Sequence, residues 1–199
     1  MSNTNRLAAL LSILFVTAFA CGQDDEKNEL GVWGGYSPDS TTSIRFLGRV
    51  PDTKLGIVGV RYSRRFFTGD NVALRYTAEV VPIAVLSYPR LIGTQRETAF
   101  AFGAAPVGIQ ANFRPHKKYQ PFAGVGGGFL RFDRPIPNTQ GKQFNFTLDF
   151  GGGLEIAHRE KRSVVLGYKY YHISNADRGT INPGFDNNVF YVGYKFHRW

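Results

Sequence analysis

The sequence predicts an all-β fold, an eight-stranded antiparallel up-and-down β-barrel, and three observations support this prediction. Aromatic residues make up 15% of the 199-residue chain and glycines number 23, a mixture that favours strands and turns over helices. Apolar residues recur with a period of two rather than 3.6, in segments of about ten to fifteen residues. The connections between these segments alternate between long and short, as in a meander whose strands pair with their sequence neighbours.

Eight such segments follow one another along the chain. They span residues 28–36, 55–66, 72–86, 99–113, 119–132, 144–157, 163–173 and 188–197. The connections predicted to be long are 37–54, 87–98, 133–143 and 174–187, and those predicted to be short are 67–71, 114–118 and 158–162. An even number of strands brings both termini of the chain to one side of the membrane, the periplasmic side, where the short turns lie.

The alternation gives each segment one apolar and one polar face. In the sixth segment Phe146, Leu148 and Phe150 share one face, whereas Thr147 and Asp149 share the other. A soluble barrel buries its apolar face inside, whereas a barrel in lipid turns that face outward and keeps charges in the lumen. Periodicity alone is compatible with both arrangements.

The N-terminus has the pattern of a secretory signal peptide at residues 1–20. Arg6 provides a positive charge, residues 7–19 are apolar, and Ala-Phe-Ala at 18–20 forms a cleavage site. Residues 21–199 are then a single transmembrane β-barrel domain that leaves the cytoplasm. Cys21 is the only cysteine, so no internal disulfide can form. Lipidation of Cys21 is an alternative to ordinary cleavage.

The placement of aromatic residues favours the bacterial outer membrane. The chain ends in aromatics, with Tyr194, Phe196 and Trp199, as outer-membrane barrels typically do. Other tyrosines near the segment ends could form a girdle at the membrane interface, namely Tyr62, Tyr88, Tyr119, Tyr168, Tyr170 and Tyr171. Export, loop alternation and these aromatics together predict a membrane barrel, with a soluble periplasmic lipid-binding barrel as the alternative.

One region carries side chains suited to catalysis. His172 and Ser174 lie at the end of the seventh segment, and Asp186 precedes the eighth. An imidazole, a hydroxyl and a carboxylate are the components of an activated serine nucleophile. Counted along their segments, all three continue the parity that faces lipid, together with Tyr170. Polar groups on that surface are costly and serve no packing purpose, so the pattern indicates a functional site.

A motif in this region resembles the lipid A 3-O-deacylase (PagL-type acyloxyacyl hydrolase) family. The motif is His-Ile-Ser-Asn-Ala at 172–176, followed by Asn-Pro-Gly at 182–184 and then an acid. Members of that family are eight-stranded outer-membrane barrels that hydrolyse an ester-linked acyl chain of lipopolysaccharide. The resemblance implies lipid A as the substrate and a carboxylic ester hydrolase as the activity.

The resemblance also implies a role for each residue of the trio. His172 would be the general base, Ser174 the nucleophile, and a carboxylate would orient the histidine. The family acid is usually Glu, and by spacing its counterpart here is Asp186. Asp is one methylene shorter, so either the backbone lies closer or the hydrogen bond is weaker. Asp177 is an alternative acid without the family spacing.

An ester hydrolase of this kind also needs donors for the oxyanion. The candidates are Asn175, Asn182 and the backbone amides around Gly179. We expect no cofactor and no metal, because the activated serine needs neither. The other histidines show no metal-ligand spacing and are interpreted as surface residues, namely His116, His158 and His197.

The net charge of +9 indicates an anionic partner. Export argues against nucleic acid and favours the phosphates of lipid A within the lipid of the outer membrane. Basic residues in or near the external loops could contact those phosphates or could simply be solvated, namely Arg90, Arg96, Arg131, Arg134, Lys142 and Arg178. Formation of a homodimer stays open, as does the acyl chain length. The alternative function is a non-catalytic small outer-membrane barrel in adhesion or envelope integrity.

Overall fold

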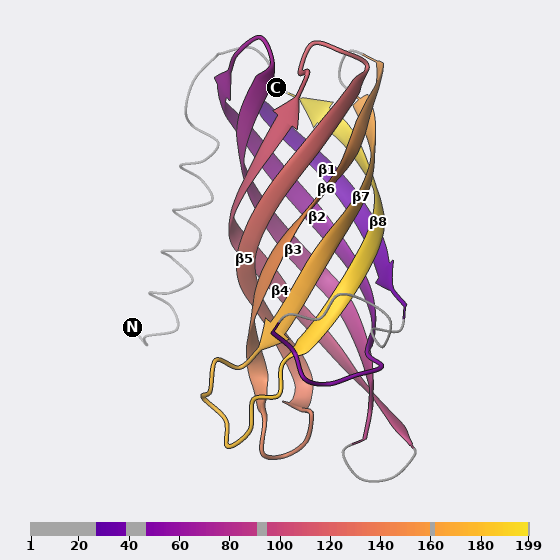
Figure 1. Cartoon of the computed structure of the whole chain (residues 1–199), viewed down its shortest axis with the longest axis vertical. Coiled ribbons are helices and arrows are strands. Elements are labelled where there is room, and N and C mark those ends of the chain that lie inside the picture. Colours follow the sequence, from indigo (N-terminus) through magenta and orange to yellow (C-terminus); the bar gives the residue numbers. More distant parts are fainter. Residues whose placement is uncertain (1–26, 39–46, 91–94, 160–161, 199) are drawn as a thin grey trace, which may run out of the picture.

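The computed structural model describes residues 27–38, 47–90, 95–159 and 162–198, and within them the chain forms one closed antiparallel barrel (Figure 1). Each strand pairs with its sequence neighbours, and β1 closes the barrel on β8. The strands are β1 (Asn28–Ser37), β2 (Lys54–Thr68), β3 (Val72–Pro89), β4 (Arg96–Phe113), β5 (Tyr119–Ile136), β6 (Lys142–Arg159), β7 (Arg162–Ser174) and β8 (Phe185–Arg198). The predicted eight-stranded barrel is confirmed. The predicted signal peptide, Cys21 and Trp199 lie outside the described residues.

Two of the four connections predicted to be long are short. The β3–β4 hairpin is paired as far as Pro89 and Arg96, and the β5–β6 hairpin as far as Ile136 and Lys142. Their polar residues suggested loops, but a ladder that continues beyond the membrane can carry charged side chains into water. The long connections that remain are 38–53 and 175–184. Residues 47–53 of the first and residues 175–184 lie at the same end of the barrel, at the bottom of Figure 1.

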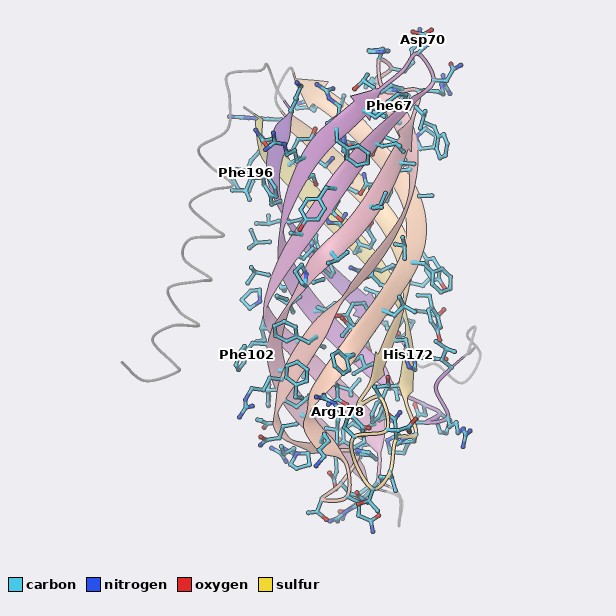
Figure 2. All side chains as sticks on the ribbon, turned by 90° about the vertical axis from the view of Figure 1, so that its left-hand side faces the viewer. Phe67, Asp70, Phe102, His172, Arg178 and Phe196 are labelled. Atoms are coloured by element: carbon cyan, nitrogen blue, oxygen red, sulfur yellow. The ribbon has the colours of Figure 1, made fainter. Side chains whose placement is uncertain are left out.

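The outer surface of the barrel is apolar over most of its height. Phe190 is 60% exposed, whereas its neighbour Val189, which points inward, is fully buried. Figure 2 shows Phe102 and Phe196 projecting outward near opposite ends of the wall. Other large apolar side chains on this surface include Phe100, Val107, Ile109, Phe146, Leu148, Phe150, Leu166 and Val192. A soluble barrel would expose its polar face instead, so this surface defines a barrel that faces lipid. Among the described residues no helix is both long and apolar enough to cross a membrane.

The lumen holds the charges that the alternation predicts, and they are paired. Glu155 is fully buried and accepts hydrogen bonds from Arg75 Nη1 at 3.0 Å and Lys195 Nζ at 2.7 Å. Lys195 Nζ also donates to Glu29 Oε2 at 2.8 Å. A second group joins Arg61 to Glu79. Pairing of this kind offsets the cost of burying charge in a narrow lumen.

The lumen is filled by an apolar cluster at the end that carries the long connections. Its members include Leu55, Leu86, Leu130, Phe132, Ile173, Phe185 and Val189. Tyr88 and Tyr171 belong to this cluster, so their predicted place in an interfacial girdle is wrong. For Tyr88 the reason is a register shift between Val81 and Ala84, which reverses the parity of β3 and turns the ring inward against Phe185. The cluster gives the nearby ends of β7 and β8 a rigid support.

The parity of β8 is directly testable. In a protein whose Cys21 has been replaced, we expect Phe190→Cys to react with a lipid-phase thiol probe and Val189→Cys to stay unlabelled, because the two side chains point to opposite sides of the wall. The measurement is labelling of the folded protein in vesicles, with heat-modifiable mobility as the control for folding. Labelling of position 189 in preference to 190 would reverse the assignment of the two faces.

Candidate active site

The pairing of β7 with β8 brings His172 directly opposite Asp186. β8 begins at Phe185, three residues earlier than predicted, so both residues lie within the ladder. His172 Nδ1 and Asp186 Oδ1 are 2.6 Å apart, and the Asp186 side chain is fully buried. When Nδ1–H donates to the carboxylate, Nε2 is left as an acceptor. The pair therefore presents a base whose tautomer is set by the acid behind it.

Ser174 is the last residue of β7 and lies two positions beyond His172, on the same face of the strand. It is half-buried, and its cross-strand partner on the neighbouring strand β6 is Phe146. Figure 2 shows His172 on the barrel wall near the end that bears the long connections. The structure thus brings the predicted hydroxyl, imidazole and carboxylate onto one patch of the outer wall.

Residues 47–53, which lead into β2, cover the acid, a contribution that the sequence did not predict. Leu47 N donates to Asp186 Oδ2 at 3.1 Å, and Thr53 Oγ1 donates to the Asp186 carbonyl at 3.1 Å. Arg49 N donates to the Pro183 carbonyl at 2.7 Å, which ties the same segment to the turn before β8. These residues lie more than a hundred positions from Asp186 in the sequence, and no local pattern marks them.

Tyr170 lies on the lipid-facing parity, as predicted, but it is only 1% exposed. Its ring packs 4.9 Å from the ring of Phe150, and its hydroxyl accepts a hydrogen bond from Leu47 N at 3.3 Å. The hydroxyl also hydrogen-bonds the Asp186 carboxylate, as does the Gly48 amide. Donors from His172, Tyr170 and the β1–β2 connection therefore converge on one carboxylate, an arrangement that stabilises its negative charge.

The candidate oxyanion donors are gathered in the β7–β8 loop, where several of them hold the loop together. Asn175 N donates to Asn182 Oδ1 at 3.0 Å, and Asn175 Nδ2 donates to the Ile181 carbonyl at 2.8 Å. Gly179 N donates to Asn175 Oδ1 at 3.4 Å. The side-chain nitrogen Nδ2 of Asn182, whose Oδ1 accepts from Asn175 N, has no hydrogen-bond partner among the described residues.

The alternative acid and the other histidines lie apart from this arrangement. Asp177 is exposed and has a positive φ of 58°, in a turn beyond the strand end. His116 and His158 are exposed at the opposite end, near the short turns. In the described part of the chain no three His, Cys, Asp or Glu side chains are grouped so that they could hold a metal ion.

The apolar belt and closed ladder define an outer-membrane β-barrel, and a His–Asp pair beside a serine is the side-chain set of an ester hydrolase. The model of the family described as lipid A 3-O-deacylase (PagL) matches residues 58–195. The chain belongs to this family, so it is an ester hydrolase, and the alternative of a non-catalytic barrel is set aside. A search among curated proteins gave no significant match.

Several solved structures share the fold of this chain. The outer membrane enzyme PagL superposes with a TM-score of 0.61 at 14% identity, over 82% of this chain and 97% of that one. Neisserial surface protein A gives a TM-score of 0.50 at 13% identity, over 88% of this chain and 99% of its own. The attachment invasion locus protein Ail of Yersinia pestis gives a TM-score of 0.50 at 11% identity, over 88% of this chain and 100% of its own. At these identities the likeness concerns the fold.

The close approach of Gly48 to Asp186 allows a test of whether the segment before β2 positions the carboxylate. A Cβ on Gly48 would lie 2.7 Å from Asp186 N and 2.8 Å from Asp186 Oδ1, so Gly48→Ala must displace either the segment or the carboxylate. We expect hydrolysis to slow by about 10²-fold while the barrel still folds, because a shift of about 1 Å in a site can cost that much. Gly56→Ala is the matched control, since a Cβ there meets nothing within 4 Å. Equal activity of the two variants, measured as fatty acid release, would show that the segment does not position the acid.

Proposed function

We propose that this protein removes the 3-O-linked acyl chain from lipid A through a triad of Ser174, His172 and Asp186. The observation that carries the proposal is the 2.6 Å contact between His172 Nδ1 and Asp186 Oδ1 on the outer wall, with Ser174 on the same face of β7. Family membership supplies the substrate class and the type of bond. The geometry supports the assignment of the roles.

In the acylation step, His172 Nε2 accepts the proton of Ser174 as Oγ attacks the ester carbonyl. A bond forms between Oγ and the carbonyl carbon, and the carbonyl oxygen becomes an oxyanion. When the intermediate collapses, the bond to the sugar oxygen breaks and His172 returns the proton to that oxygen. Water then attacks the acyl-enzyme by the same sequence and releases the fatty acid. Asp186 holds the imidazole and stabilises the imidazolium in both halves.

We infer that a close backbone, rather than a weaker hydrogen bond, accommodates the shorter side chain of Asp186. Asp186 lies directly across the ladder from His172, and its carboxylate is held from the other side by Leu47 N at 3.1 Å. This arrangement supports the closer-backbone alternative for an aspartate at a position where the family usually has glutamate. Asn182 is the first candidate for the oxyanion donor, whereas Asn175 and Gly179 act mainly by shaping the loop around it.

A site on the outer wall suits a substrate that stays in the bilayer. The acyl chains of lipid A remain in the outer leaflet while the ester, at the boundary with the sugars, meets Ser174 from the side. A lumenal site would require a chain to leave the lipid at about 0.8 kcal/mol per CH₂, or on the order of 10 kcal/mol for a dozen carbons. The lumen at this end is also filled by the apolar cluster.

Removal of single triad members tests the shared step. We expect His172→Ala and Ser174→Ala each to abolish nearly all deacylation, and the double variant to be little slower than either, because the members of a triad act as one unit. The measurement is the mass of lipid A, by mass spectrometry, from cells that express each variant. Losses that multiply in the double variant would contradict a common step. If lipid A from cells with Ser174→Ala still lacks its 3-O-linked acyl chain, the serine has no part in the mechanism.

The choice of acid is tested by a matched pair of substitutions. Asp186→Asn should preserve the barrel and slow hydrolysis by about 10⁴-fold, by analogy with soluble triads, because the amide favours the wrong imidazole tautomer. Asp177→Asn is the control and should have a much smaller effect, since Asp177 is exposed in the turn beyond β7. Turnover rates of the purified proteins decide the ranking. The reverse order would transfer the role of the acid to Asp177.

A further inference from the structure

The six basic residues near the external loops fall into two groups. Three are paired with neighbouring carboxylates, which largely neutralise them. Arg90 Nε lies 3.0 Å from Glu97 Oε1, Arg134 Nη2 lies 2.9 Å from Asp133 Oδ2, and Arg96 is paired with Asp52. The other three are Arg131, Lys142 and Arg178, which form no ion pair within the described part of the chain.

These three cations line one cleft of about 580 Å³ on the outside of the barrel, which we call the basic cleft. Its walls come from β5, from the start of β6, and from the β7–β8 loop. The remaining lining residues are Pro135, Thr139, Gly141, Gln143 and Phe144. No acidic side chain is among the described residues that line it, so the cleft concentrates positive charge over a small volume.

Arg178 is held in a fixed position at the edge of the basic cleft. Its Nε donates to the Asn175 carbonyl at 3.2 Å, and its Nη2 donates to the Phe144 carbonyl at 3.2 Å. The guanidinium also lies over the rings of Phe144 and Phe146, at 5.0 and 4.5 Å from their centroids. An arginine ordered in this way loses little side-chain entropy when it binds an anion.

The basic cleft lies beside the proposed nucleophile. Ser174 is paired across the ladder with Phe146, whose ring contacts Arg178, and Asn175, which accepts from Arg178, is the next residue after Ser174. Thr180 N donates to the Gln140 carbonyl at 3.0 Å, which joins the β7–β8 loop to the β5–β6 hairpin that forms the other wall. A molecule whose ester reaches Ser174 can therefore reach the basic cleft with a neighbouring group.

We propose that the basic cleft binds a phosphate monoester on the sugar head of the same glycolipid molecule whose ester is cleaved at Ser174. The proposal rests on the proposed function and deepens it by assigning a substrate subsite. Guanidinium and ammonium groups form charge-assisted hydrogen bonds with phosphate oxygens. Two anchors on one substrate, a phosphate in the basic cleft and an ester at Ser174, would select which acyl chain faces the nucleophile.

The phosphate could instead belong to a neighbouring lipid, and the experiment must separate these two sources. We compare lipid A with its enzymatically dephosphorylated form, each presented in mixed micelles to the purified full-length protein. The variants are Arg131→Gln and Lys142→Gln, because Arg178 also holds the β7–β8 loop and its removal would disturb the site. Arg134→Gln is the matched control, since this arginine is already paired with Asp133.

The quantity measured is the ratio of kcat/KM for the phosphorylated substrate to that for the dephosphorylated one. We expect Arg131→Gln and Lys142→Gln each to lower this ratio by about tenfold, mainly through KM, and the Arg134→Gln ratio to match the wild type. An unchanged ratio in both variants overturns the proposal. A loss that is equal on both substrates and varies with added anionic phospholipid assigns the cleft to a neighbouring lipid and also overturns it.

Binding measurements separate failure of this proposal from failure of the proposed function. In a Ser174→Ala background, addition of Arg131→Gln should weaken binding of phosphorylated lipid A by about tenfold, whether or not Ser174 is the nucleophile. If Ser174→Ala remains active while binding still depends on Arg131, the triad is wrong and the subsite stands. If Ser174→Ala is inactive but binding is independent of both Arg131 and Lys142, the triad stands and the subsite is wrong.

Discussion

The closed hydrogen-bond ladder is the constraint on which the rest of this structure depends. Backbone groups in lipid have no water to bond, so every strand must pair on both sides, and the pairing of β1 with β8 removes the last free edge. Once the ladder is closed, each strand has one face toward lipid and one toward the lumen. Phe190 and Val189 illustrate this division, because adjacent residues differ from largely exposed to fully buried.

The same ladder creates the site. It places His172 of β7 opposite Asp186 of β8, so that a base and its acid meet without any helix or inserted domain. The apolar cluster inside the barrel supports the two strands from behind, and Leu47, from the β1–β2 connection, holds the acid from outside. A rigid wall between a packed lumen and an ordered cover suits a reaction on a substrate that remains in the membrane.

Charge is distributed unevenly between the parts of the molecule. In the lumen, Arg75 and Lys195 are paired with Glu155, where unpaired charges would be costly. Near the external loops, Arg90, Arg96 and Arg134 are paired with carboxylates as well. The basic cleft beside Ser174 keeps its positive charge. Positive charge left uncompensated in the basic cleft is available to a ligand, whereas the paired charges serve the fold.

The sequence by itself determined the barrel, the alternation of apolar and polar faces along its strands, and the motif of His172, Ser174 and Asp186. Each of these follows from a period of two or from the spacing of chemical types over a short stretch, which are local properties. The tertiary structure decided the rest. It extended the β3–β4 and β5–β6 hairpins beyond the predicted ends, turned Tyr88 inward at a register shift, and brought Leu47 and Gly48 onto Asp186. It also placed three of the six basic residues near the external loops beside carboxylates and the other three in the basic cleft. These features depend on which distant segments meet when the barrel closes, and no local pattern encodes that meeting.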